Sequence, residues 1–199
     1  MQSLLSFTLF LLPIVSAWTP NDIPNPRTNF RECKMRSISR VCDPDEVLSE
    51  GNRYRIHTRL TNMQTSSAGR GGGFCENKGL EGNFVAVNQG DQMLANGIYD
   101  KWQTDAQCGK AVLILVSKNT NQMYIAGASR AGISDTQVQQ ITTQANMHIS
   151  QNNVIPGVEG AIQAMTDAVA PTNTNRVPTD HPINPPDAPQ GGRGGRTGT

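Results

Sequence analysis

The chain contains 199 residues, a length that accommodates one folded domain together with additional segments. Its hydrophobic fraction of 36% and aromatic fraction of 5% predict a core of modest size. Its net charge of +1 provides no bulk attraction to nucleic acid or anionic lipid, so we expect neither as a partner.

The first residues have the pattern of a secretory signal peptide. Leu4 to Ala17 are largely apolar, and the uninterrupted part of this run is too short to span a bilayer comfortably. The run ends in "VSA", which places small residues at the positions that signal peptidase reads. The first three residues carry no Lys or Arg, so an N-terminal membrane anchor is the alternative. We predict that residues 1–17 are cleaved and that the protein is secreted, extracellular and not inserted into a membrane.

Four cysteines follow the predicted cleavage site, and the segment around the first of them is rich in Pro, Asn and Arg. We interpret residues 18–41 as an extended leader with little structure of its own. An even number of Cys residues in an oxidising compartment indicates disulfides. Zinc is the alternative ligand, but the spacing contains no C-x-x-C pair and the three His residues are scattered. The cysteines are Cys33, Cys42, Cys75 and Cys108.

The next segments alternate between helix and strand patterns. Ser49 can cap a helix whose apolar stripe contains Ile56, Leu60 and Met63, and His57 on this helix is expected to face solvent. A Gly-rich loop, "TSSAGRGGGFCENKG", leads to the short strand "NFVAVN". The segment "DQMLANGIYDKW" then has helical spacing, with a stripe of Met93, Leu94, Ile98 and Trp102.

The apolar run "AVLILV" predicts a strand that is covered on both faces. The strand "MYIA" follows closely enough to form a hairpin with it. The order strand, helix, strand from Phe84 to Val116 predicts a right-handed crossover between parallel strands. Cys75 and Cys108 each precede one of these strands, so we expect them to pair at one sheet edge, and Cys33–Cys42 to close a local loop.

Two further helices complete the pattern. Ser134 and Gln137 form a potential capping box for the first, which has the stripe Val138, Ile141, Ala145 and Ile149. The second carries Val158, Ile162, Met165 and Val169. We therefore expect a small three-layer α/β sandwich over residues 42–170, with a central short β-sheet flanked by helices and stapled by disulfides. Residues 171–199 are dominated by Pro and Gly and predict a disordered tail.

The order of these pieces, above all "VCDPDEVLSE" and "CGKAVLILVSKNTNQMYIAG" followed by "ISD", resembles the modulator-of-levamisole-receptor family of nematodes, a branch of the TPM-domain superfamily. The resemblance covers about residues 18–170 and implies a TPM-domain-like α/β sandwich. It also implies an accessory protein of acetylcholine-gated channels. Founding members of the branch carry a transmembrane helix, whereas a tail is expected here.

Some TPM-domain proteins are linked to phosphatase activity and divalent-ion binding through three acidic positions. Asp43 matches the first of these positions and Asp135 the third. The middle position falls on Gly109-Lys110, where a cation replaces the carboxylate, which disfavours Ca²⁺. Each Asp also has a structural interpretation, Asp43 as a turn cap and Asp135 as a favourable charge at a helix N-terminus.

Two functional classes follow. The first is a secreted, non-catalytic binding or accessory module without cofactor, whose partner is an extracellular protein or membrane receptor. The second is a metal-dependent phosphatase-like hydrolase with Asp43 and Asp135 as residual Ca²⁺ ligands. For the first class, exposed loops held by a rigid scaffold are the expected contact sites. These candidates are Arg70, Phe74, Lys118, Asn119 and Asn121.

Overall fold

The computed structural model describes residues 18–69 and 72–170 of the chain. The predicted signal peptide, the predicted tail and Arg70 lie outside the described residues. The elements in chain order are β1 (Val41–Cys42), α1 (Glu50–Ser66), α2 (Phe74–Asn77), β2 (Glu81–Val87), α3 (Gln92–Trp102), β3 (Ala111–Ser117), β4 (Gln122–Ala126), α4 (Asp135–Ile149) and α5 (Val154–Val169).

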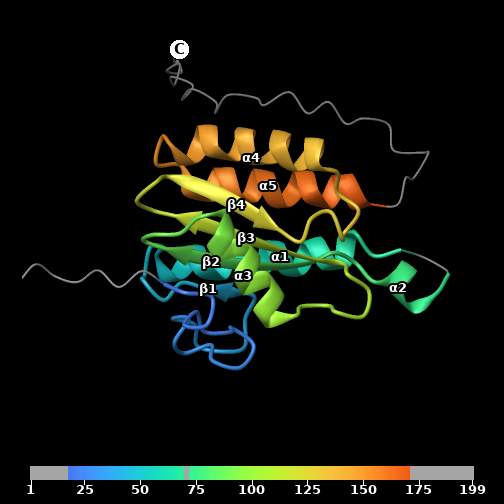
Figure 1. Cartoon of the computed structure of the whole chain (residues 1–199), viewed down its shortest axis with the longest axis horizontal. Coiled ribbons are helices and arrows are strands. Elements are labelled where there is room, and N and C mark those ends of the chain that lie inside the picture. Colours follow the sequence, from blue (N-terminus) through green and yellow to red (C-terminus); the bar gives the residue numbers. More distant parts are fainter. Residues whose placement is uncertain (1–17, 70–71, 171–199) are drawn as a thin grey trace, which may run out of the picture.

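The centre of the molecule is one four-stranded sheet with the spatial order β1-β2-β3-β4 (Figure 1). β1, β2 and β3 run parallel, with Glu81 opposite Ala111 at the start of the β2–β3 pair. β4 runs antiparallel to β3, as expected for the hairpin. Every residue of β2 and β3 is buried, which confirms that "AVLILV" lies in a sheet covered on both faces.

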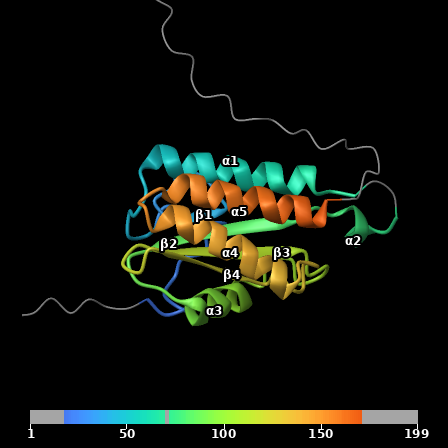
Figure 2. The ribbon, with the colours of Figure 1, turned by 90° about the horizontal axis from the view of Figure 1, so that it is seen from above.

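Helices cover both faces of this sheet and produce three layers (Figure 2). α1 packs on β2 and α5, and α4 packs on β4 and α5. α3 lies on the opposite face, against β3 and β4. The connections β1–α1–β2 and β2–α3–β3 each join two parallel neighbouring strands, and both step across the sheet in the same direction. Because α1 and α3 cover opposite faces of the sheet, these two crossovers have opposite hands. One of them therefore departs from the right-handed rule.

The helix starts follow from local capping chemistry. The Ser49 hydroxyl accepts a hydrogen bond from the Asn52 amide, and the Asp91 carboxylate accepts one from the Leu94 amide. Ser134 and Gln137 form the expected capping box at α4. Each bond satisfies an amide that the first helical turn leaves without an intrahelical partner.

The structure of the leader differs from the expectation. Residues 18–40 are a series of turns without helix or strand, but Ile23 and Met35 are buried in the same core as the sheet. Gly97 on α3 allows this packing, because a Cβ there would lie 2.4 Å from Cγ of Pro20. The leader packs because its few apolar side chains find a hydrophobic surface on the domain.

Two individual side chains also differ from the expectation. Met93 was expected in the core-facing stripe of α3, but it is 79% exposed, and the buried stripe consists of Leu94, Ala95, Ile98 and Tyr99. His57 was expected to face solvent, but its ring is half-buried and its Nδ1 lies 3.3 Å from the Arg40 amide and from the Ser39 hydroxyl. The returning leader covers this part of α1.

The structure contains the disulfides Cys33–Cys42 and Cys75–Cys108, the two pairs expected from the sequence. Disulfides of this kind indicate an extracellular or lumenal compartment. Within residues 18–69 and 72–170, none of the helices combines the length and the apolar character needed to cross a membrane.

Candidate functional site

Asp43 lies at the end of β1, and its carboxylate is fully buried. One oxygen accepts a hydrogen bond from the Val47 amide at 2.8 Å, and the other accepts from the Leu48 amide at 3.0 Å. Arg53 Nη1 donates to the second oxygen at 3.1 Å. Burial raises the pKa of Asp43, while these hydrogen bonds and the arginine oppose the rise. Asp43 is thus a turn cap and one half of a buried ion pair.

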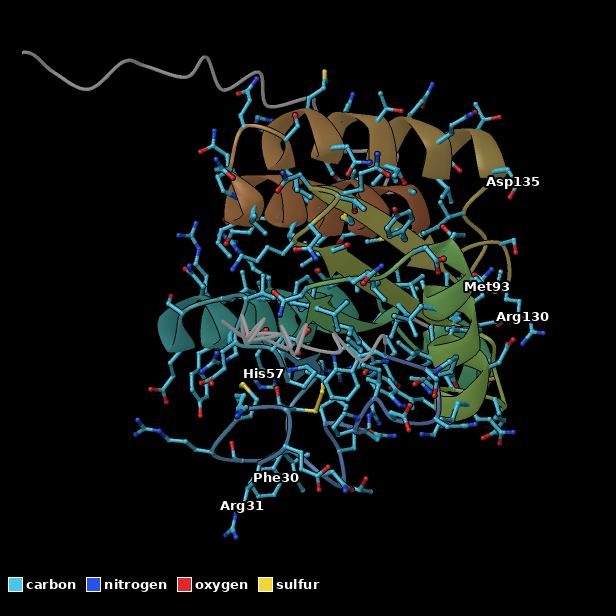
Figure 3. All side chains as sticks on the ribbon, turned by 60° about the vertical axis from the view of Figure 1, so that its left-hand side comes forward. Phe30, Arg31, His57, Met93, Arg130 and Asp135 are labelled. Atoms are coloured by element: carbon cyan, nitrogen blue, oxygen red, sulfur yellow. A yellow bond between two sulfur atoms is a disulfide. The ribbon has the colours of Figure 1, made fainter. Side chains whose placement is uncertain are left out.

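Asp135, the other acid carried over from the TPM-domain pattern, lies elsewhere. It is the first residue of α4 and is exposed (Figure 3). Within the described part of the chain, there is no group of three or more His, Cys, Asp or Glu side chains that could hold a metal ion. Asp43 and Asp135 therefore do not belong to an assembled metal centre among these residues.

A carboxylate that the sequence reasoning missed lies beside the middle position of the pattern. Asp105 is 1% exposed at its side chain and forms an ion pair with Lys78. It also accepts hydrogen bonds from the Lys110 amide at 2.8 Å and the Cys108 amide at 3.4 Å. An Asp that precedes a strand and bonds amides a few residues on is typical of a turn, and that signal could have identified it.

The loop that Asp105 organises belongs to one end of the sheet, where β2 and β3 begin. We call the region formed by α2, residues 103–110 and Arg130 the disulfide end, because Cys75–Cys108 joins its first two parts. Below it, the buried carboxylate of Glu81 pairs with Arg27, with Lys78 at 3.7 Å and with Arg40 at 3.9 Å. Burial lowers the pKa of Arg40, although Glu81 opposes this change. These ion pairs fix the start of β2.

α2 carries Phe74, one of the binding candidates, on a projection of the disulfide end (Figure 1). Phe74 is 68% exposed, although large apolar side chains are normally buried. The short helix is held by the disulfide and by Lys110, whose Nζ donates to the carbonyls of Glu76 at 3.2 Å and Lys78 at 3.0 Å. An exposed aromatic ring is thus presented on a restrained backbone.

The hairpin candidates lie at the other end of the strands. Lys118 and Asn119 are exposed, and Asn121 is half-buried with a left-handed φ of 50°. The turn is fixed to the end of β2, because the Lys118 amide donates to the Val87 carbonyl and the Asn119 amide donates to the Asn88 carbonyl. The two predicted binding loops consequently do not form one continuous surface.

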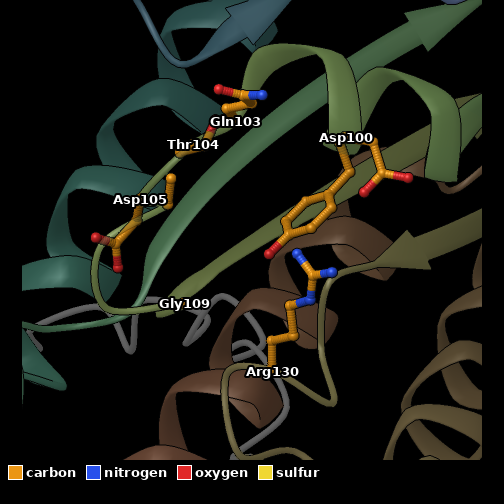
Figure 4. A pocket seen from close by; sticks show the side chains of 8 residues that line it. Asp100, Gln103, Thr104, Asp105, Gly109 and Arg130 are labelled. Atoms are coloured by element: carbon orange, nitrogen blue, oxygen red, sulfur yellow. The ribbon is translucent and has the colours of Figure 1, made fainter.

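The disulfide end also contains a cavity of about 590 Å³ that the sequence did not reveal (Figure 4). Its residues come from the C-terminal part of α3, the loop after it and the segment after β4, so no short motif connects them. They are Tyr99, Asp100, Gln103, Thr104, Asp105, Ala106, Gly109 and Arg130.

Comparison with solved structures identifies the same fold in a bacterial domain. The N-terminal domain of a protein from P. gingivalis is 16% identical with a TM-score of 0.58, and the match covers 77% of this chain and 92% of that chain. The BA42 protein from Bizionia argentinensis is 16% identical, with a TM-score of 0.49 and coverage of 63% and 83%. The first similarity confirms the expected TPM-domain-like α/β fold and bears on the fold alone.

Comparison with protein families finds a family model that matches the N-terminal and central parts of the chain. A search of curated proteins finds no match. The family model described as modulator of levamisole receptor-1 matches residues 18–121, which is more than half of the chain. This segment includes the leader, both disulfides and the sheet as far as the hairpin turn. The chain therefore belongs to the modulator of levamisole receptor-1 family.

Proposed function

We propose that this protein is a secreted, non-catalytic binding module that modulates a membrane receptor of the acetylcholine-gated channel class. Membership of a receptor-modulator family supports this partner class. The two disulfides support action in an oxidising compartment outside the cytosol. The predicted cleavage after Ala17 would free the module from its N-terminal apolar run.

Phe74 is the observation that carries the proposal. Aromatic side chains dominate the binding energy of many protein interfaces, and a restrained aromatic loses little conformational entropy on binding. α2 presents Phe74 in this way, since the disulfide and Lys110 hold its backbone. We therefore assign the receptor contact to the disulfide end, with Phe74 as its anchor.

The test measures binding of the secreted protein to cells with and without a levamisole-gated channel on their surface. We expect saturable binding only to channel-bearing cells. Phe74→Ala should weaken it by about thirtyfold, the effect of losing roughly 2 kcal/mol at an anchor position. Met147→Ala is the matched control, because Met147 is 56% exposed but lies on α4. Equal loss in both variants, or no binding by the wild type, would contradict the proposal.

The metal-dependent hydrolase is the second candidate, and the position of Asp43 disfavours it. A hard cation needs several oxygen ligands and excess negative charge, whereas Asp43 is fully buried and is already paired with the positive charge of Arg53. Phosphatase turnover measured with Ca²⁺, Mg²⁺ or Mn²⁺ decides between the candidates. We expect none, and metal-dependent turnover that disappears in Asp135→Asn would favour the hydrolase.

A further inference from the structure

The cavity at the disulfide end has one wall from α3 and another from the segment after β4. Figure 4 shows Arg130 extending upward from the bottom of the view, with Asp100 and Gln103 above it and Asp105 to its left. Its volume of about 590 Å³ lies in the usual range for sites that bind small molecules. The lining is mainly polar, which suits a small polar ligand rather than an apolar one.

The α3 wall of this cavity is fixed by close packing. Tyr99 is 8% exposed and is placed against the backbone of Gly127. A Cβ at Gly127 would lie 2.2 Å from Cε2 of Tyr99, and the φ of +81° at this position also favours glycine. Only a residue without a side chain thus permits this position of the tyrosine ring.

The loop wall is held in an unusual backbone conformation. Gln103, Asp105 and Gly109 have positive φ angles of 44°, 53° and 68°. The Asp105 carboxylate, its ion pair with Lys78 and the Cys75–Cys108 disulfide hold the loop in this shape. Left-handed non-glycine residues are unfavourable by themselves and tend to occur at functional sites. The cavity is therefore preorganised rather than a gap between mobile loops.

The charges around the cavity are balanced but separate. Lys78 neutralises Asp105 from outside the cavity. Arg130 and Asp100 are both exposed, and in the part of the chain that the structure describes neither forms an ion pair or a side-chain hydrogen bond. One cation and one anion consequently line the same preorganised space without neutralising each other.

We propose that this cavity binds a small zwitterion, a molecule of the amino-acid class with one carboxylate and one ammonium group. Arg130 binds the carboxylate, because the guanidinium geometry matches two carboxylate oxygens. Tyr99 lines the same cavity, and a tyrosine hydroxyl is able to donate a hydrogen bond to a carboxylate. Asp100 binds the ammonium group. Phe74 does not line the cavity, so this site is separate from the proposed receptor contact.

The experiment uses ¹⁵N-labelled secreted protein and three zwitterions of increasing charge separation: glycine, β-alanine and γ-aminobutyrate. We expect at least one to shift the amide signals of residues 99–109 and 130 in a saturable manner. Acetate and methylamine, which carry only one of the two groups, should bind at least about tenfold more weakly. This comparison tests whether both charges are recognised.

Two variants test which protein side chain binds each charged group of the zwitterion. Arg130→Gln and Asp100→Asn should each weaken binding of the best zwitterion by at least about tenfold without changing the unfolding midpoint, since both side chains are exposed. Arg31→Gln, an exposed arginine on the leader, is the matched control and should bind normally. The proposal fails if no zwitterion binds, if acetate binds as well as the best zwitterion, or if Arg130→Gln has no effect. Phe74→Ala should leave this binding unchanged, so the result is independent of receptor binding.

Discussion

Asp43 has two interpretations in the sequence, as a metal ligand or as a turn cap, but a single structural role beside Arg53. The carboxylate was a metal-ligand candidate because of its position in a family pattern. In the structure it is fully buried and satisfied by two amides and by Arg53, which is itself buried. Breaking such a pair leaves an uncompensated charge in the interior, which is costly even where the intact pair contributes little.

Arg53→Ala should therefore lower the free energy of unfolding by about 3–5 kcal/mol. Arg59→Ala, on the same helix, removes a half-exposed partner of Glu159 and should cost at most about 1 kcal/mol. Urea unfolding of the two variants gives the comparison. Similar small losses in both would show that Asp43 does not depend on its arginine.

His57 should make stability depend on pH. Burial, assisted by the nearby charge of Arg40, lowers the pKa of His57 below its ordinary value of 6.5. The unfolded chain therefore binds the proton first as the pH falls. The contribution of His57 to stability is complete above pH 6.5 and is lost as the pH falls through the lower folded pKa.

Unfolding measured on both sides of pH 6.5 checks this expectation. Wild type should lose stability on acidification, and His57→Asn should lose less, because the amide oxygen can still accept from the Arg40 amide without taking up a proton. His148→Asn, on the exposed face of α4, serves as the control. An identical pH slope in wild type and His57→Asn would refute the assignment.

At the scale of elements, regular patterns were predictable and contacts made by irregular segments were not. β3 was evident because its apolar run leaves no face for water, and the cap of α4 was evident from Ser134 and Gln137. Periodicity alone placed Met93 on the buried stripe of α3, but the face that α3 presents to β3 and β4 is centred on Leu94, Ala95 and Ile98. The spacing is compatible with a buried face that includes Met93 and with one that excludes it, and packing against the sheet determines which face of α3 is buried.

α2 depends on its disulfide more than on its own sequence. It has four residues, none of them buried, so hydrophobic packing contributes little to its position. The Cys75–Cys108 bridge closes a loop with a sequence separation of 33. In the chain-entropy description, a loop of this length stabilises the fold by about 4 kcal/mol.

The double variant Cys75→Ser/Cys108→Ser should thus lose about 4 kcal/mol of unfolding free energy and become sensitive to proteolysis near Phe74. Mass spectrometry without reductant should show that Cys33–Cys42 is intact, which isolates the effect of the second bridge. A loss below about 1 kcal/mol with unchanged proteolysis would mean that other contacts hold α2.

At the scale of the whole molecule, the leader and the sheet share one core. The sequence did not predict this, because the leader is rich in Pro and Asn and its contacts are distant in sequence. Ile23 is nevertheless 1% exposed, whereas Ile38 in the same segment is 66% exposed. The cavity was unpredictable for a related reason, since Arg130 and Asp100 are brought together only when β4 returns beside α3.

Ile23→Ala should lower the free energy of unfolding by about 2–4 kcal/mol, because it removes buried methyl groups and leaves a void. Ile38→Ala should change it by less than about 0.5 kcal/mol, as expected for an exposed position. Denaturant unfolding of both variants distinguishes a packed leader from a loosely attached one, and equal small effects would indicate the latter.

We propose that the protein modulates a receptor through its disulfide end. The most direct measurement records agonist-evoked currents of a levamisole-gated channel before and after addition of the purified protein. We expect wild type and Met147→Ala to change the current, and Phe74→Ala to require about thirtyfold more protein for the same change. Currents that are unaffected by wild type, or equally affected by all three proteins, would contradict it.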